Sequence, residues 1–191
     1  MKLIMLRHGQ TEDNVRRVFP RKDCKLTELG KKQMRDACKK IREFEITKIL
    51  SGPYVRTREC LAEILKELDL PYEIYHNIHE IETDFIEGMS AKEAMEKHPE
   101  IMKAWYSDYQ NYRLPNSESF MDVYIRAGKV IEDLSKREGN LLLITHQMFI
   151  EMMLANVLEN PNIAYKFTIN NGSLSIIEII DDIITIERVN Y

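Results

Sequence analysis

The chain has few cysteines and no long hydrophobic run. Its three cysteines, Cys24, Cys38 and Cys60, stand among 191 residues without the CxxC or related spacing that is typical of metal sites. This sparse set predicts free thiols in a reducing compartment, because disulfide-rich chains belong to oxidising ones. No stretch approaches the roughly 20 apolar residues that a membrane span needs, and the apolar run from Lys2 is interrupted by Arg7, too early for a signal peptide. We therefore expect a cytoplasmic protein with no membrane partner.

The chain also lacks an excess of basic residues. Its formal net charge is −4 at pH 7, whereas proteins that bind nucleic acid generally carry a basic surface. We therefore expect no nucleic-acid partner, although a local basic pocket is compatible with this charge, because a cleft concentrates the field of the few charges that line it. The length predicts a single domain over residues 1–191.

Short apolar runs alternate with amphipathic segments along the chain. Buried strands are predicted at residues 2–6, 46–50, 72–75 and 141–145, and a closing hairpin at 174–180 and 183–189, joined by Asp181-Asp182. One helix is predicted to begin after the cap residue Thr27, and a second after Ser51-Gly52-Pro53, with an inward face that extends to Leu68. A third is predicted from a capping box of Ser119 and Asp122 to near Gly139. A fourth is predicted from the inward-facing apolar residues between Ile150 and Leu158.

This alternation predicts an α/β fold of three layers, with a mostly parallel sheet and helices on both faces. The stretch from about residue 77 to 118 is less regular and holds Trp105 and several tyrosines. We expect it to form a cap of short helices over one end of the sheet. The aromatic residues there are expected to be either the core of this cap or a surface that stacks on an aromatic substrate.

Histidines, arginines and a carboxylate occur shortly beyond the predicted strands. Arg7 and His8 follow the first strand, and Arg56 comes soon after the second. Glu80 lies a few residues after the third strand, and His146 directly follows the fourth. Ligands of open α/β sheets bind beyond the carboxyl ends of the strands, so these side chains are expected to converge.

The expected cluster suits phosphoryl transfer. Arginine guanidinium groups match the geometry of phosphate oxygens, a neutral imidazole can attack phosphorus, and a protonated carboxyl group can give its proton to the leaving alkoxide. Neither a metal ion nor another cofactor is required. The proton donor stays open on this reasoning, because Glu80 has rivals in His79, Glu82, Asp84 and Glu87.

Several motifs surround these residues. Leu6-Arg7-His8-Gly9-Gln10-Thr11, followed by Asn14, stands directly after the first strand. Further motifs occupy residues 26–33, 51–56, 80–88, 117–119 and 144–146. With these motifs the sequence resembles the histidine phosphatase superfamily, also called phosphoglycerate-mutase-like, over most of the chain. The resemblance implies the phosphoglycerate-mutase-like form of the three-layer fold.

The resemblance also implies a role for each site residue. It makes His8 the nucleophile that accepts the phosphoryl group and Glu80 the proton donor. It implies that the phosphate is bound by Arg7, Asn14, Arg56 and His146. The chain departs from the usual family residues at Thr57, Cys60, Thr83, Asp84, Ile86 and Gln147. None of these departures removes a catalytic group.

The family holds both phosphatases and mutases, and mutases that resemble this chain are usually longer after the acidic loop at residues 80–88. We therefore expect a metal-independent phosphatase that hydrolyses a small phosphomonoester through a phosphohistidine on His8. A phosphoglycerate mutase-type activity and a non-catalytic or protein-directed regulatory role are the alternatives. The expected partner is a small phosphorylated substrate, and the sequence is equally compatible with a monomer and a homodimer.

Overall fold

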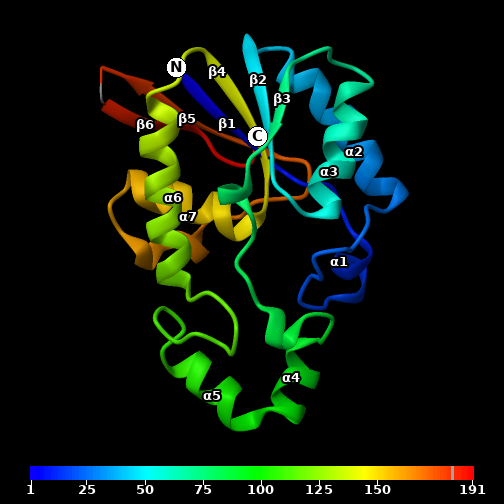
Figure 1. The fold of residues 1–191 in the computed structure, drawn as a ribbon, viewed down its shortest axis with the longest axis vertical. Coiled ribbons are helices and arrows are strands. Elements are labelled where there is room, and N and C mark those ends of the chain that lie inside the picture. Colours follow the sequence, from blue (N-terminus) through cyan, green and yellow to red (C-terminus); the bar gives the residue numbers. More distant parts are fainter. Residues whose placement is uncertain (182) are drawn as a thin grey trace.

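A mixed six-stranded sheet forms the centre of the molecule (Figure 1). The computed structural model describes residues 1–181 and 183–191, so Asp182 of the predicted hairpin turn lies outside the described residues. The strands are β1 Lys2–Arg7, β2 Ile46–Ser51, β3 Tyr72–Ile74, β4 Asn140–Thr145, β5 Leu174–Ile180 and β6 Ile183–Arg188. Each predicted strand is therefore confirmed to within one residue at either end.

The sheet is parallel on one side and antiparallel on the other. Its strand order is β3-β2-β4-β1-β5-β6. The strands from β3 to β1 pair in parallel, whereas β5 runs antiparallel to both β1 and β6. The predicted mostly parallel sheet and its closing hairpin are confirmed.

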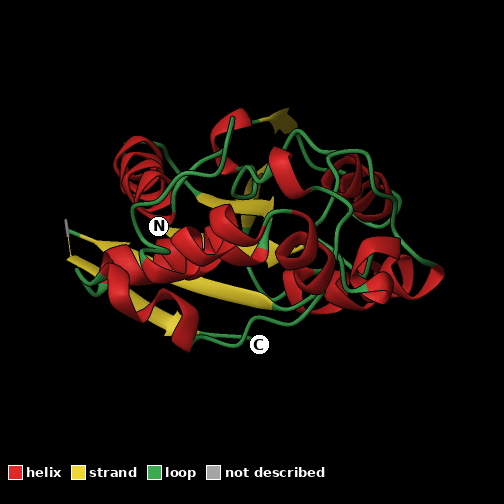
Figure 2. Cartoon of the chain, turned by 90° about the horizontal axis from the view of Figure 1, so that it is seen from below, coloured by secondary structure: helices red, strands yellow, loops and turns green. Residues whose placement is uncertain are grey.

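Helices cover both faces of the sheet, as Figure 2 shows. The helices α2 Glu28–Ile41 and α3 Val55–Leu65 pack on one face, and α6 Phe120–Ser135 and α7 Gln147–Val157 pack on the other. In β1, Leu3 and Met5 point toward α6 and α7, whereas Ile4 and Leu6 point toward α2 and α3. Successive strand residues face opposite sides, so a strand covered on both sides has to be apolar throughout. The predicted three-layer fold is confirmed.

Polar caps fix where the helices begin. The Thr27 hydroxyl accepts a hydrogen bond from the Gly30 amide at 3.1 Å. The Ser119 hydroxyl accepts one from the Asp122 amide at 3.1 Å, and the Asp122 carboxylate accepts one from the Ser119 amide at 2.8 Å. The predicted capping box is thus confirmed. A short helix, α1 Glu12–Arg16, was not predicted, because it is too short for hydrophobic periodicity to indicate it.

The predicted helix ends are less accurate. Helix α3 ends at Leu65, so Leu68 packs against the core from the following turn rather than from the helix. Helix α6 ends at Ser135, before the predicted stop near Gly139. The prediction that Leu158 faces inward is wrong, because α7 ends at Val157 and the Leu158 side chain is about half exposed.

Residues 77–118 extend beyond the end of the sheet (Figure 1). They contain the helices α4 Ala91–Lys97 and α5 Pro99–Ser107 and two short 3-10 turns, η1 His76–Ile78 and η2 Asp84–Ile86. The elements α4, α5 and η2 share a small apolar core that includes Ile86, Met102 and Trp105, whereas Ile78 of η1 belongs to the core beside α6 and α7. No helix within the described ranges combines the length and the apolar character needed to cross a membrane.

Candidate active site

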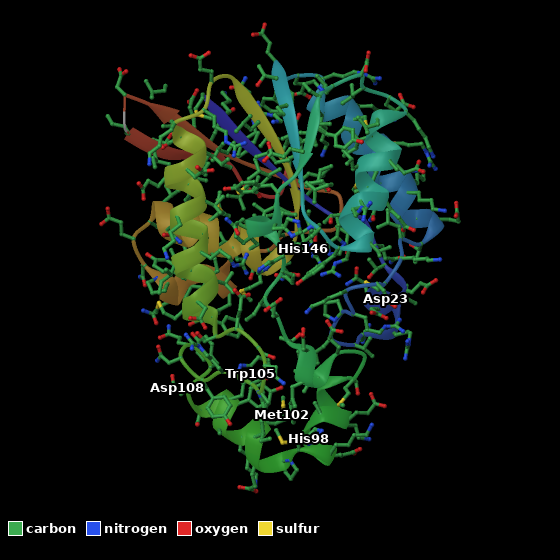
Figure 3. All side chains as sticks on the ribbon, viewed as in Figure 1. Asp23, His98, Met102, Trp105, Asp108 and His146 are labelled. Carbon is green, nitrogen blue, oxygen red and sulfur yellow. The ribbon has the colours of Figure 1, made fainter. Side chains whose placement is uncertain are left out.

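The turns that leave β1, β2 and β4 are held together by main-chain hydrogen bonds. The His8 amide donates to the Thr145 carbonyl oxygen at 3.0 Å, and the Gly52 amide donates to the Ile144 carbonyl oxygen at 3.0 Å. These bonds bring the residues after three strands to one edge of the sheet. Figure 3 shows His146 at this edge, on the side that faces Trp105 of α5. The edge therefore lies between the sheet and the segment 77–118.

His8 is buried and has one tautomer defined by its main-chain contact. Its Nδ1 lies 2.8 Å from the Gly9 carbonyl oxygen. A carbonyl oxygen can only accept, so Nδ1 carries the hydrogen and Nε2 keeps its lone pair. Burial, reinforced by the positive charges of Arg56 and Arg7, lowers the pKa of His8 well below its ordinary value. The imidazole is therefore neutral at physiological pH and has a free nucleophilic nitrogen.

His146 has the opposite tautomer. The Nε of Arg56 donates a hydrogen bond to Nδ1 of His146 at 3.2 Å, so the hydrogen of this ring is on Nε2. Burial, followed by the charge of Arg56, lowers the pKa of His146 well below its ordinary value. The rings of His8 and His146 meet edge to face with their centroids 5.2 Å apart. Nε2 of His8 thus offers a lone pair, whereas Nε2 of His146 offers an N–H group.

Two buried donors at this site have no partner. Within residues 1–181 and 183–191, the only fully buried side-chain nitrogen or oxygen atoms without a hydrogen bond are Nε of Arg7 and Nε2 of His146. Buried donors in native proteins are almost always paired. A ligand that supplies several acceptor oxygens would satisfy both atoms, and a phosphoryl group has this chemistry.

The two arginines are anchored by carbonyl oxygens. Arg56 is about 1% exposed, and its Nη1 donates to the Arg21 carbonyl oxygen at 2.9 Å. Arg7 donates through Nη1 to the Ile169 carbonyl oxygen. Burial lowers the pKa of the Arg7 guanidinium, which nonetheless stays charged because its ordinary pKa is so high. Two fixed positive charges therefore flank His8.

Glu80 contacts the beginning of α7, next to His146. Its carboxylate accepts hydrogen bonds from the Ile81 amide at 3.0 Å and from the Met148 amide at 3.4 Å. Burial raises the pKa of Glu80, and the charge of Arg56 opposes this shift without cancelling it. The carboxyl group can therefore hold a proton more readily than an exposed glutamate does.

The other acids of the loop are placed differently. Burial lowers the pKa of His79 to about 3, so this ring is neutral at neutral pH and lacks the acidic imidazolium proton that a general acid needs. Glu82 and Asp84 both face Lys22, at 3.5 and 2.8 Å. Burial and Asp84 also raise the pKa of Glu87, so it is the contact with α7 that distinguishes Glu80.

Asn14 lies at the rim of the cluster. Its Oδ1 accepts a hydrogen bond from the Thr11 amide at 3.0 Å and caps α1. The same oxygen accepts one from Asn171 at 3.3 Å, and Asn171 also donates to the His8 carbonyl oxygen at 3.0 Å. Asn171 was not predicted, because Asn170-Asn171-Gly172 before a strand indicates only a turn.

A second residue that was not predicted is Glu151 on α7. Its side chain is buried, and the charges of Arg7 and Glu80 lie near enough to affect the pKa of Glu151. A charged residue inside the apolar run of residues 148–155 is the signal that would have indicated it.

Two known phosphatases are similar in sequence to this chain over most of its length. The chain is 29% identical over 181 residues to phosphoserine phosphatase 1 of Hydrogenobacter thermophilus, covering 93% of this chain and 86% of that protein. It is 26% identical to the adenosylcobalamin/alpha-ribazole phosphatase of Salmonella typhimurium, covering 100% of this chain and 96% of that one. The crystal structure of the alpha-ribazole phosphatase from Shigella flexneri has the same fold, with a TM-score of 0.93 at 23% identity, covering 100% of this chain and 96% of that one.

The family comparison covers almost the whole sequence. Residues 3–191 match the family described as histidine phosphatase superfamily (branch 1). This range includes each residue of the candidate site, from Arg7 to His146. The chain belongs to the histidine phosphatase superfamily.

Proposed function

We propose that this protein is a metal-independent phosphatase that hydrolyses a small phosphomonoester through a phosphohistidine on His8. The observation that carries the proposal is the pair of buried donors without partners, Nε of Arg7 and Nε2 of His146, beside a neutral His8 with a free Nε2. Phosphatase relatives that align along most of the chain support it.

In the first step, Nε2 of His8 attacks phosphorus while the bond to the ester oxygen breaks. Arg7, Arg56 and His146 donate hydrogen bonds to the phosphoryl oxygens, and Asn14 is an accessory ligand. Charge accumulates on these oxygens and on the leaving oxygen, where fixed donors stabilise the transition state. Protonated Glu80 transfers its proton to the leaving oxygen, so that the product is a neutral alcohol.

In the second step, the Glu80 carboxylate accepts a proton from a water molecule that attacks phosphorus. The bond between phosphorus and His8 breaks, and inorganic phosphate is released. Glu80 and His8 return to their starting protonation states, so the cycle closes.

No step of this cycle needs a metal ion, because Arg7 and Arg56 supply the positive charge that phosphoryl transfer requires. No group of three or more potential metal-ligating side chains occurs in the part of the chain that the structure describes. We expect activity to be unchanged by EDTA. We further propose that the enzyme acts in the cytoplasm, where its three free, buried cysteines would stay reduced.

The test is hydrolysis of p-nitrophenyl phosphate by the wild type and by His8→Ala. We expect the variant to lose turnover while keeping its fold. The matched control is His76→Ala, since His76 is exposed. The wild type should also take up a phosphoryl label that is acid-labile and alkali-stable. An active His8→Ala variant would refute the mechanism, and conversion of 3-phosphoglycerate to its 2-isomer would instead establish a mutase.

A further inference from the structure

An aromatic cavity opens beside the proposed site. It has a volume of about 620 Å³ and lies between α5, α6, α7 and the 3-10 turn η3 Pro161–Lys166. Its aromatic lining consists of Trp105, Tyr106, Tyr109, Phe120, Tyr165 and Phe167. The mechanism above uses none of these side chains.

This aromatic cavity adjoins a second cavity that reaches the position of the proton donor. A smaller cavity of about 210 Å³ is lined by Glu80, and both cavities share Trp105, Phe120 and Met148 in their walls. Because Glu80 protonates the leaving oxygen in the proposed function, the rest of the leaving alcohol extends from Glu80 toward the aromatic cavity.

The aromatic walls are arranged by contacts among themselves. The ring of Tyr109 meets Phe120 edge to face at 5.4 Å between centroids and meets Tyr165 in the same way at 5.8 Å. The ring of Trp105 lies 6.2 Å from that of Phe120. Rings that pack on one another keep their faces in place, so the cavity is formed before a ligand enters.

A buried carboxyl group, that of Glu151, also lines the aromatic cavity. The Glu151 side chain is about 2% exposed and accepts one hydrogen bond, from Gln147 at 2.8 Å. Burial raises its pKa to about 7. Among the described residues, no lysine or arginine lines this cavity. A buried carboxyl group is costly unless it is paired, and here it faces aromatic rings.

We propose that the aromatic cavity binds an ammonium group on the leaving alcohol, so that the preferred substrates are phosphate monoesters of amino alcohols. This inference rests on the proposed phosphatase function. A cation is attracted both by the faces of aromatic rings and by the Glu151 carboxylate. A leaving alcohol that carries a carboxylate finds no basic side chain to pair with among the described residues that line this cavity.

The experiment compares phosphocholine with 3,3-dimethylbutyl phosphate, which replaces the quaternary nitrogen by carbon and so removes the charge at nearly constant shape. We expect wild-type kcat/KM to favour phosphocholine by roughly tenfold or more, as an ion pair and cation–π contacts together would give. Glu151→Gln should lower this ratio several-fold, because glutamine keeps the shape and removes the charge, while the aromatic faces still favour the cation.

Two further variants complete the design. Glu100→Gln makes the same charge change on α5, where the side chain is 85% exposed, and should keep the wild-type ratio. Tyr165→Leu removes one ring face at a half-exposed position and should lower the ratio several-fold even if Glu151→Gln folds poorly.

The outcomes separate the two proposals. If the wild type hydrolyses p-nitrophenyl phosphate but treats phosphocholine and its neutral isostere equally, this inference is wrong and the phosphatase function stands. A higher kcat/KM for the neutral isostere would also overturn the inference. If the wild type hydrolyses none of p-nitrophenyl phosphate, phosphocholine and the neutral isostere, the proposed function itself fails.

Discussion

Replacing Arg56 by lysine tests how the site is organised, because the change keeps the positive charge and removes the planar fork of donors. Arg56 bonds to His146 Nδ1 through Nε and to the Arg21 carbonyl oxygen through Nη1, at 3.2 and 2.9 Å. A lysine ammonium group is a compact point charge and cannot occupy both nitrogen positions. At least one buried acceptor therefore loses its partner in Arg56→Lys.

The magnitude follows from these contacts. An unpaired buried acceptor costs about 1–3 kcal/mol of folding free energy, so the variant should melt at a lower temperature. Losing one fixed donor to a transition state costs about 2.7–4 kcal/mol, or about 10²–10³-fold in rate. Without the Arg56 hydrogen bond, the tautomer of His146 is also no longer fixed, which weakens a second donor. We expect kcat/KM for p-nitrophenyl phosphate to fall by about 10² or more.

Steady-state kinetics, thermal melting and ¹⁵N NMR of the His146 ring measure these three effects. Arg58→Lys is the matched control, since Arg58 lies on the same helix and is exposed. It should leave all three quantities nearly unchanged. Arg56→Lys with kcat/KM within threefold of the wild type would show that charge alone suffices, and the argument from donor geometry would be refuted.

Three further predictions concern Glu80, the histidines and Gly30. Because burial raises the pKa of Glu80, the wild type should lose activity on alkyl esters as the pH rises through that pKa. Glu80→Gln should remove this decline and slow alkyl esters far more than aryl esters, and equal losses on both would point to another proton donor. Burial lowers the pKa values of His8 and His146, so their NMR signals should stay constant from pH 7 to 5 while free histidine titrates; a shift near pH 6.5 would contradict this. Gly30→Ala should lower the melting temperature, because the new Cβ would lie 2.1 Å from the Gln10 carbonyl oxygen. The same change inside a helix ordinarily stabilises the protein by about 1 kcal/mol, so a raised melting temperature would contradict this close approach.

The sequence predicted the elements that depend on periodicity. The strands from residues 2–6 and 141–145 were predictable because a strand buried on both faces has to be continuously apolar. Short elements such as α1 carry no such signal. The end of α3 was misjudged because Leu68 is apolar and packs on the core, and periodicity does not distinguish a helical turn from the turn that follows it.

The edge on which the site lies was predictable for a topological reason. Arg7 is the last residue of β1, and His8 and His146 directly follow β1 and β4, parallel neighbours whose carboxyl ends meet at one edge. Glu80 was harder to assign, because only the contact of its carboxylate with Met148 separates it from the other acids of the loop. Glu151 was missed for a related reason: the aromatic residues that line a cavity with it, such as Trp105 and Tyr165, come from distant segments of the chain.

The Gly9 carbonyl group fixes the tautomer of His8, and the Arg56 guanidinium group fixes that of His146. The Gly9 carbonyl keeps the hydrogen of His8 on Nδ1, so Nε2 is free to form the bond to phosphorus. In the proposed phosphohistidine, Nδ1 would still donate to the Gly9 carbonyl oxygen, and the ring would carry positive charge beside Arg56. Repulsion between these two charges would favour transfer of the phosphoryl group to water, which restores a neutral ring. In the proposed mechanism, burial and the charge of Arg56 together keep His8 unprotonated before the reaction, and the same charge helps to bind the phosphoryl group during it.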